Sequence, residues 1–259
     1  KIRNINILRD ETHSVPVVAG GIEYTDKKSL YNYMINHLRY SLKNSRTINP
    51  FSINIEAQQS VDFIKTSIEA FYTLYFEKEE KGIDVRLFAG TFIDNSSANA
   101  GKYRFRLSGF SPTRFNESDY LYDYTFLNRS ENEGVLSQQF YEQDGGFKIY
   151  TAGSQAQNWM AAINVKAYIP KLGLPIRVFG DAGVVDADSR IKGSKSLSYD
   201  AGFCIALPAT IFEIYFPLVY SEDIKNYITA NKISFVERIR VVLNFNLLNP
   251  FDFLRNFSL

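Results

Sequence analysis

Apolar and polar residues alternate along most of the segment 157–247. In its last part, an extended chain would place Ile239, Val241, Leu243 and Phe245 on one side and Arg238, Arg240 and Asn244 on the other. A period of two is typical of a β-strand with one apolar and one polar face. The segments 159–169, 176–184, 197–207 and 210–220 repeat the pattern, so the sequence predicts a series of strands here.

The predicted strands are long and carry charged residues near their centres. Each has about ten residues, the length that a tilted strand needs to cross a lipid bilayer. Lys166, Arg177 and Asp181 lie in mid-strand on the polar side, as do Arg238 and Arg240. A membrane barrel turns its apolar residues to lipid and its polar residues to the interior, whereas a soluble sheet turns its polar face outward. The alternation alone does not decide between these two arrangements.

The connections between the predicted strands alternate between short and long. Short ones are expected at 44–49, 78–82, 170–175 and 208–210, and long ones at 94–101, 128–156, 186–195 and 221–233. Outer-membrane barrels have short periplasmic turns, longer extracellular loops and, in bacteria, even strand numbers. The predicted fold is therefore all-β, a transmembrane antiparallel up-and-down β-barrel of about twelve strands, with a range of roughly 10 to 16.

The organisation of the chain follows from this fold. Residues 1–14 are predicted to be an entry segment or linker, 15–248 the barrel and 249–259 a C-terminal tail. The first barrel strand is expected at 15–24, with a loop at 24–29. Further strands are expected at 50–58, 83–93, 102–110 and 119–127. The segments 33–43 and 62–76 fit a helical face as well as a strand, and strands are favoured because β-branched and aromatic residues are frequent there.

Composition narrows the class of protein. The chain has 259 residues and a formal net charge of +1, which gives no indication of a nucleic-acid partner. No run of about 18 apolar residues is present, which excludes a helical membrane protein. The single cysteine, Cys204, excludes an internal disulfide. No signal peptide begins at Lys1, so we expect a mature chain or the C-terminal part of a longer protein.

Aromatic residues make up 15% of the chain, an enrichment expected of a barrel with aromatic girdles at both membrane interfaces. One set is expected at the outer interface, namely Trp159, Tyr199, Tyr220 and Phe235. The other set is expected at the inner interface, namely Phe51, Phe76, Phe212 and Phe245.

Catalytic and metal-binding motifs are absent from the sequence. His13 and His37 belong to no His-Glu-x-x-His motif, and there is no Gly-x-Ser-x-Gly elbow or phosphate-binding loop. We therefore expect no enzyme activity, no cofactor and no metal in this chain. Inward carboxylates are expected to pair with inward arginines across the interior rather than to act as acid and base. The candidate pore-lining residues are Arg238, Arg240, Arg86 and Glu69.

Several motifs occur in a fixed order in the last two fifths of the chain. They are Gly145-Gly146, then Phe179, Asp181 and Gly183 in VFGDAGV, Tyr199 and Gly202 in SYDAGF, then FEIYFPL, and finally RIRVVLNF ending at Phe245. This order resembles the barrel C-terminus of the bacterial surface-antigen superfamily, the outer-membrane assembly factors and two-partner-secretion pores. The chain departs from that family because it lacks the Val-Arg-Gly-Phe loop motif and the periplasmic repeat domains, and because it continues past the aromatic end signal.

The resemblance implies that a long loop enters the barrel and that its arginine meets the Phe-x-Asp-x-Gly strand. In this chain the candidate loop is 128–157 and the nearest arginine is Arg129. By alternation Asp181 points inward, where an unpaired charge is costly. We therefore predict that Arg129 contacts Asp181 and occludes the interior. Wall residues are the competing partners of Asp181, above all Lys166, with Arg177 as another interior candidate.

The function expected is that of an outer-membrane β-barrel that serves as the membrane anchor or translocation unit of a larger surface protein. Its location would be the outer membrane of a Gram-negative bacterium. A second likeness, to barrels that follow a zinc aminopeptidase-like domain, implies an upstream metallopeptidase-like domain outside this chain. The alternatives are a protein-translocation or assembly pore of the surface-antigen superfamily and a soluble β-rich binding module.

The expected partners are the lipid bilayer, proteins on the periplasmic side or upstream domains of the same protein, and no nucleic acid. Residues expected to face lipid are Ile239, Val241, Leu243, Phe245, Phe216 and Ile163.

Overall fold

The structure is a computed structural model that describes eleven stretches of the chain. These are residues 2–16, 22–46, 48–76, 81–95, 103–108, 138–151, 155–156, 158–169, 175–186, 197–206 and 212–243. For residues 2–16 and 22–33, as for Gln155 and Leu243, only the backbone is described.

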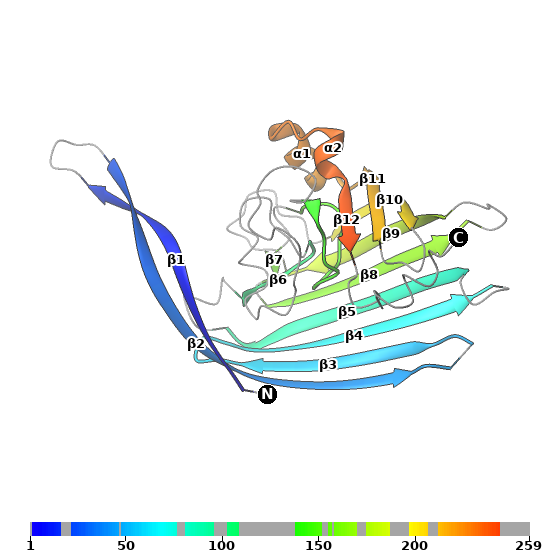
Figure 1. Cartoon of the computed structure of the whole chain (residues 1–259), viewed down its shortest axis with the longest axis horizontal. Helices are drawn as coiled ribbons and strands as arrows, with labels where there is room; N and C mark the ends of the chain where they lie inside the picture. The colour runs from blue at the N-terminus through cyan, green and yellow to red at the C-terminus, as the bar shows by residue number, and fades with distance from the viewer. Residues whose placement is uncertain are drawn as a thin grey trace, which may run out of the picture.

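The described fold is all-β and contains one ten-stranded antiparallel sheet. In sheet order its strands are β1 (Ile2–Pro16), β2 (Ile22–Asn44), β3 (Phe51–Gln59), β4 (Ile64–Tyr75), β5 (Gly82–Asp94), β8 (Trp159–Tyr168), β9 (Ile176–Val185), β10 (Leu197–Ala206), β11 (Phe212–Tyr220) and β12 (Arg240–Leu243). Each strand pairs with the next in this order, and no pairing joins β1 to β12 among the described residues. The sheet is strongly curved (Figure 1).

Smaller elements accompany this sheet. The strands β6 (Phe105–Arg106) and β7 (Gln155–Ala156) form a separate pair, and the helices α1 (Glu222–Ala230) and α2 (Phe235–Arg238) connect β11 to β12. Neither of these helices is long and apolar enough to cross a membrane, and the described chain contains no other that is. Figure 1 shows β6 and β7 on the side towards which the sheet curves.

The strand β2 pairs with different partners along its length. Its first part, Ile22–Asn36, pairs with β1, and its last part, Asn36–Asn44, pairs with β3. The β1–β2 ribbon therefore extends beyond the rest of the sheet (Figure 1). The predicted loop at 24–29 is wrong because these residues continue β2. Their register places Lys27 opposite Glu11 and Lys28 opposite Asp10, pairs of opposite charge that favour a ladder.

The sequence predicted the main strands correctly but not all of the connections. The ambiguous segment 62–76 is a strand, β4, and the segments 50–58, 83–93, 159–169, 176–184 and 197–207 match β3, β5, β8, β9 and β10. The strand expected at 102–110 is reduced to β6, because Phe105 and Leu107 pack into the interior instead of joining the sheet. The strand expected at 119–127 lies outside the described residues.

The connection 221–233 was predicted as a loop but contains α1. Glu222 and Asp223 in its first turn favour a helix start, and Ile224 and Ile228 bury one helical face. Arg238 was predicted in a strand but ends α2, whose first turn is closed by a capping box between Ser234 and Glu237. The last strand therefore begins at Arg240.

The two predicted aromatic sets lie at opposite ends of the sheet. Trp159 opposite Thr91 and Tyr220 opposite Asp200 mark one end. Phe51 opposite Tyr72, and Phe212 at the start of β11, mark the other end. Of the remaining members, Phe235 lies on α2 rather than in the sheet, and Phe245 lies outside the described residues.

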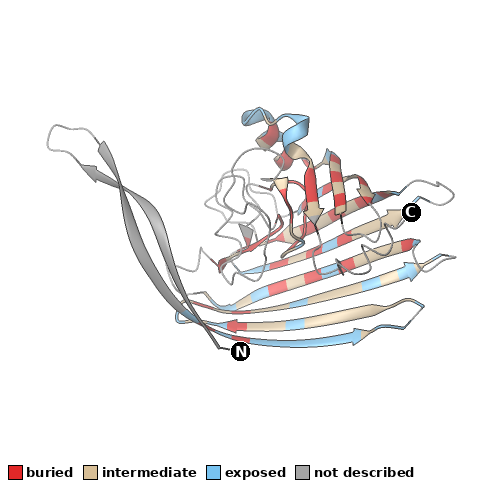
Figure 2. Cartoon of the chain, viewed as in Figure 1, coloured by how far each residue is buried: buried red, intermediate tan, exposed pale blue. Residues whose placement is uncertain are grey.

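Burial is inverted relative to a water-soluble sheet. The convex face carries exposed apolar side chains, including Leu38, Ile55, Ile68, Leu87, Ile163, Val178, Leu197 and Leu218. The concave face buries polar ones, including Arg86, Asn164, Arg177, Asp181, Asp200 and Glu213. Along β9 the alternation is regular, with Arg177, Phe179 and Asp181 buried and Val178 exposed between them. Figure 2 shows exposed and buried positions alternating along the strands.

An apolar core fills one end of the concave side. The wall residues Phe88, Met160, Ala162 and Val185 meet Phe105, Leu107, Phe147 and Ile149 from the inner segments and Ile224 and Ile228 from α1. Gly90 and Gly183 make this packing feasible. A Cβ atom at Gly90 would collide with the ring of Phe105, and one at Gly183 would collide with Leu107.

Candidate functional site

Residues 138–151, called here the docked segment, lie against the concave face of the sheet. The amide of Phe140 donates to the carbonyl of Val241 on β12, at 2.8 Å. The amide of Gly145 donates to the carbonyl of Arg106 at 3.0 Å, and that of Phe147 donates to the carbonyl of Leu107 at 2.9 Å. The docked segment is therefore attached to β12 at one end and to the residues around β6 near its middle.

A tight turn at residues 144–146, called here the tip, brings the docked segment closest to the wall. Asp144 and Gly146 have φ angles of 46° and 66°, in the left-handed region. A Cβ atom at Gly146 would lie 2.7 Å from a guanidinium nitrogen of Arg86, and one at Gly145 would press on Leu107. Glycine is needed at both positions because the backbone approaches the wall and the neighbouring segment so closely.

Lys148 links the docked segment to the wall strand β9. Its Nζ atom lies 3.2 Å from Oδ1 of Asp181, and both side chains are almost fully buried. The same Nζ donates to the carbonyl of Gly146 at 2.8 Å and contacts Glu142 at 3.3 Å. A buried ammonium with carboxylate and carbonyl partners is satisfied in place and costly to separate from them.

Wall residues from two further strands, β5 and β8, bind the tip. Asn164 on β8 donates to the carbonyl of Gly145 and to Oδ1 of Asp181, both at 2.9 Å. Arg86 on β5 donates to the carbonyl of Asp144 at 2.6 Å and to Asn164 at 2.8 Å. Arg86 is itself paired with Glu69 on β4, at 2.7 Å. The tip is therefore recognised through its backbone carbonyls by a connected network on β4, β5, β8 and β9.

The charges of Glu142 and Lys148 in the docked segment are stabilised in their ionised forms. Burial opposes ionisation of Glu142, but the positive charges of Lys148, Arg86 and Lys166 outweigh it and lower the pKa of that carboxyl to about 2. Burial likewise acts to lower the pKa of Lys148, but Asp181 and Glu142 outweigh it and raise that pKa above the ordinary lysine value. The docked segment is thus held by ion pairs at neutral pH.

Asp181 is buried on the concave side, and its partners differ from the cations that the sequence analysis named. Lys166 does not bind Asp181, because it lies 3.0 Å from Glu213 and 3.2 Å from the hydroxyl of Tyr215. Arg177 pairs with Asp84 at 3.0 Å. Arg129 lies outside the described residues. The loop cation that contacts Asp181 is Lys148, which sequence reasoning missed although it follows the Gly-Gly pair by two residues.

The predicted pore-lining residues are all engaged. Arg86 and Glu69 face the interior, as expected, but pair with each other there. Arg240 is buried and donates to the carbonyls of Glu237 and Ile239 at 2.8 and 2.9 Å. Arg238 lies on α2 and donates to the hydroxyl of Tyr220 at 2.7 Å.

The residues predicted to face lipid differ in how far they are exposed. Ile163 is exposed on the convex face, and Phe216 and Ile239 are half-buried. Val241 is instead buried, because the docked segment pairs with the edge of β12 at Gln139 and Val241. The side chain of Leu243, and the whole of Phe245, lie outside the described part of the chain.

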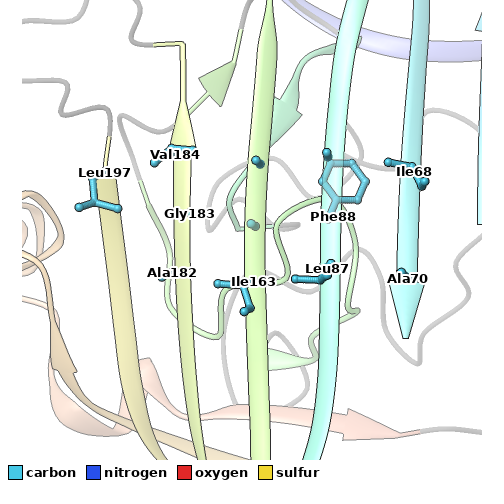
Figure 3. Close-up of a pocket in the computed structure, with 12 residues that line it drawn as sticks. Ile68, Ala70, Leu87, Phe88, Ile163, Ala182, Gly183, Val184 and Leu197 are labelled. Atoms are coloured by element: carbon cyan, nitrogen blue, oxygen red, sulfur yellow. The ribbon is translucent and has the colours of Figure 1, made fainter. Parts of the chain in front are cut away.

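The convex face contains an apolar groove with a volume of about 520 Å³. It runs across β4, β5, β8, β9 and β10 and is lined by Ile68, Ala70, Leu87, Phe88, Ala89, Ala161, Ala162, Ile163, Ala182, Gly183, Val184 and Leu197. Figure 3 shows larger side chains such as Ile68, Leu87 and Ile163 coming from neighbouring strands, with Ala70 and Ala182 beside them. No ionisable group lines this groove.

No group of metal-ligating side chains occurs in the eleven described stretches. No family model, curated protein or solved structure matches the chain. The features of the molecule that bear on its function are the inverted burial of the sheet and the docked segment.

Proposed function

We propose that the chain is a bacterial outer-membrane β-barrel that serves as the membrane anchor or translocation unit of a larger surface protein. The observation that carries this proposal is the inverted burial of the sheet. Leu87, Ile163 and Val178 are exposed on the convex face, while Arg86, Asn164 and Asp181 are buried behind them. Lipid, rather than water, is the solvent in which this arrangement is favourable.

The energetic reason for placing the sheet in lipid is its apolar convex face. Each buried leucine or isoleucine side chain contributes about 1.5–3 kcal/mol relative to exposure to water. Large contiguous apolar surfaces on soluble proteins are rare and mark contacts with membranes or other proteins. The apolar groove is continuous with this face, so lipid acyl chains are its proposed occupants. The alternative hypothesis of a soluble β-rich binding module does not explain why such a face is exposed.

A lipid-embedded sheet has to be closed. Unpaired backbone groups have no partner in hydrocarbon, so spanning sheets are barrels without free edges. The described sheet supplies ten strands. Closure of this sheet into a barrel of about twelve strands is part of the proposal.

The docked segment favours the role of anchor over that of open pore. Ion pairs and hydrogen bonds from four wall strands hold its tip in the interior. The alternative is a translocation or assembly pore of the surface-antigen superfamily. Such a pore requires the docked segment to leave the interior of the barrel. The likeness of VFGDAGV and its neighbouring motifs to that superfamily supports the alternative, as does the non-covalent nature of the contacts.

Fluorescence quenching by lipid tests the membrane proposal. The chain has one tryptophan, Trp159, which is 47% exposed on the convex face. After refolding into vesicles that contain bromine-labelled phospholipids, we expect its emission to be quenched. Two matched variants in a Trp159→Phe background sharpen the test, since Ile163→Trp should be quenched strongly and the inward Phe179→Trp weakly. Equal quenching at the two positions, or a folded chain that stays in solution without detergent, would exclude the proposal.

A further inference from the structure

Two buried carboxyl groups face each other next to Lys148. Asp181 on β9 and Asp200 on β10 are directly opposite in the ladder. They are 3% and 1% exposed. Side chains of directly opposed residues lie on the same face of a sheet within reach of each other. The pair therefore concentrates negative charge at one place in the interior.

The hydrogen bonds of this pair are incomplete. Oδ1 of Asp181 accepts from Lys148 and Asn164. Oδ2 of Asp181 and both carboxyl oxygens of Asp200 have no hydrogen-bond partner of normal geometry among the described residues. A buried carboxylate with few donors is strongly disfavoured, and among the described residues only the backbone amide and the ammonium charge of Lys148 support the ionised form of Asp200, against its burial and the neighbouring Asp181.

The surrounding charges do not compensate for a second carboxylate. Lys148 and Glu142 approach from the docked segment, and Glu213 and Tyr215 lie on β11. The nearby wall cations have other partners, since Arg86 pairs with Glu69 and Lys166 with Glu213. Among the described residues, the cation that contacts Asp181 is Lys148, and the same ammonium also contacts Glu142.

We propose that the Asp181–Asp200 pair is a proton-binding site that holds one proton on the carboxyl of Asp200. The O–H group of Asp200 then donates to Oδ2 of Asp181. Asp181 remains the carboxylate partner of Lys148. Neighbouring carboxyls in a shared site hold a proton in this way because two adjacent negative charges repel each other. This single proton supplies a donor to Oδ2 of Asp181 and removes the second negative charge.

The proton acts as part of the attachment of the docked segment. In the unfolded chain both carboxyls are ionised above a pH of about 4. The folded chain therefore binds one proton more than the unfolded chain at neutral pH. By linkage, the free energy of unfolding falls as the pH rises and this proton is lost. Alkaline pH should accordingly loosen the docked segment before it melts the sheet.

Infrared spectroscopy of the refolded full chain at neutral pH detects the proton directly. A protonated carboxyl has a carbonyl stretching band that a carboxylate lacks, and we expect native-minus-variant spectra to contain it for Asp200→Asn. Asp181→Asn should remove the same band, because a single remaining carboxyl ionises beside Lys148. Asp84→Asn is the matched control and should leave it unchanged, since Asp84 is ion-paired with Arg177.

Thermal unfolding assigns the proton to one residue. We expect Asp200→Asn to keep the unfolding midpoint at neutral pH and to flatten its decline towards alkaline pH. Asp181→Asn should lower the midpoint, because Lys148 loses its carboxylate.

Two results would overturn the proposal that Asp181 and Asp200 share a proton. One is the absence of a difference band for Asp200→Asn. The other is a midpoint that falls in Asp200→Asn and rises with added sodium or calcium chloride in the native chain, which would assign the place to a metal cation. Both measurements need only the folded chain, so they are independent of whether lipid quenches Trp159.

Discussion

At the residue scale, one ammonium group joins the docked segment to the wall. Lys148 contacts Asp181, Glu142 and the carbonyl of Gly146, and its side chain is almost fully buried. Removing one member of a buried ion pair leaves the other charge uncompensated, which is far more costly than replacing both. The energetic consequence of this contact can therefore be separated from that of its neighbours by single and double substitutions.

Lys148→Met should destabilise the folded chain by about 3–5 kcal/mol, because Asp181 loses its cation. The double variant Lys148→Met, Asp181→Asn should recover most of that loss, since no buried charge is left unpaired. Denaturant titration in detergent measures both. Lys225→Met on the exposed side of α1 is the control and should have little effect. Additive losses in the double variant would show that the two residues do not act as a pair.

Ile163→Arg should hinder assembly in lipid, at a cost of about 2–4 kcal/mol near the bilayer midplane. The physical reason is that an arginine on the lipid-facing side has neither water nor a partner. Val61→Arg is the matched control, since Val61 is 93% exposed in the turn between β3 and β4 and outside the apolar band. Folding yield into vesicles is the readout. Equal yields for the two variants would contradict a lipid-facing position of Ile163.

At the element scale, the docked segment and the wall fit each other through glycine positions. Gly183 on β9 faces Leu107 and Phe147, so that a methyl group there has no room. Gly180 lies on the same strand with no atom closer than 4.0 Å to the place of a Cβ atom. Alanine at Gly180 therefore tests only the β-propensity of the strand. Alanine at Gly183 tests, in addition, the contact with the docked segment.

Gly183→Ala should loosen the docked segment, whereas Gly180→Ala should be neutral or slightly stabilising. Limited proteolysis measures this difference, because a released segment is cleaved while the strands remain protected. We expect faster cleavage within 138–151 in the first variant only. Similar cleavage of both variants would mean that the glycines serve the strand rather than the docking of the segment.

At the scale of the whole molecule, two kinds of contact close the interior. The apolar core, with Phe105, Leu107 and Phe147, lies towards the end marked by Trp159. Ion pairs and a polar cavity of about 180 Å³ lie towards the other end, with Asp84 and Lys166 among the lining residues. In the proposed barrel, loss of the ion pairs should therefore weaken closure before the apolar core is disturbed.

Asp181→Ala should open the proposed barrel, because Lys148 is left buried without its carboxylate and the tip is expelled. Conductance in planar bilayers measures this, and the native chain should conduct poorly. Asp84→Ala, which breaks the separate pair with Arg177, is the control and should stay closed. A native chain that already conducts freely, with no change in Asp181→Ala, would refute closure by the docked segment.

The sequence by itself determined the strands β3, β4, β5, β8, β9 and β10 and which of their faces is polar. Alternation is a local property of an extended backbone, so β9 and its burial pattern follow directly from VFGDAGV. The need of Asp181 for a buried partner follows in the same way, because an inward carboxylate requires a cation wherever it comes from.

Only the tertiary structure decided which residues meet across the interior. Lys148 is separated from Asp181 by 33 residues, and nothing local distinguishes it from Lys166 or Arg177 as a partner. The partner strand of residues 24–29, the helix α1 and the burial of Val241 likewise depend on surfaces contributed by distant segments. Such contacts are decided by docking in three dimensions, which the period of a single strand does not encode.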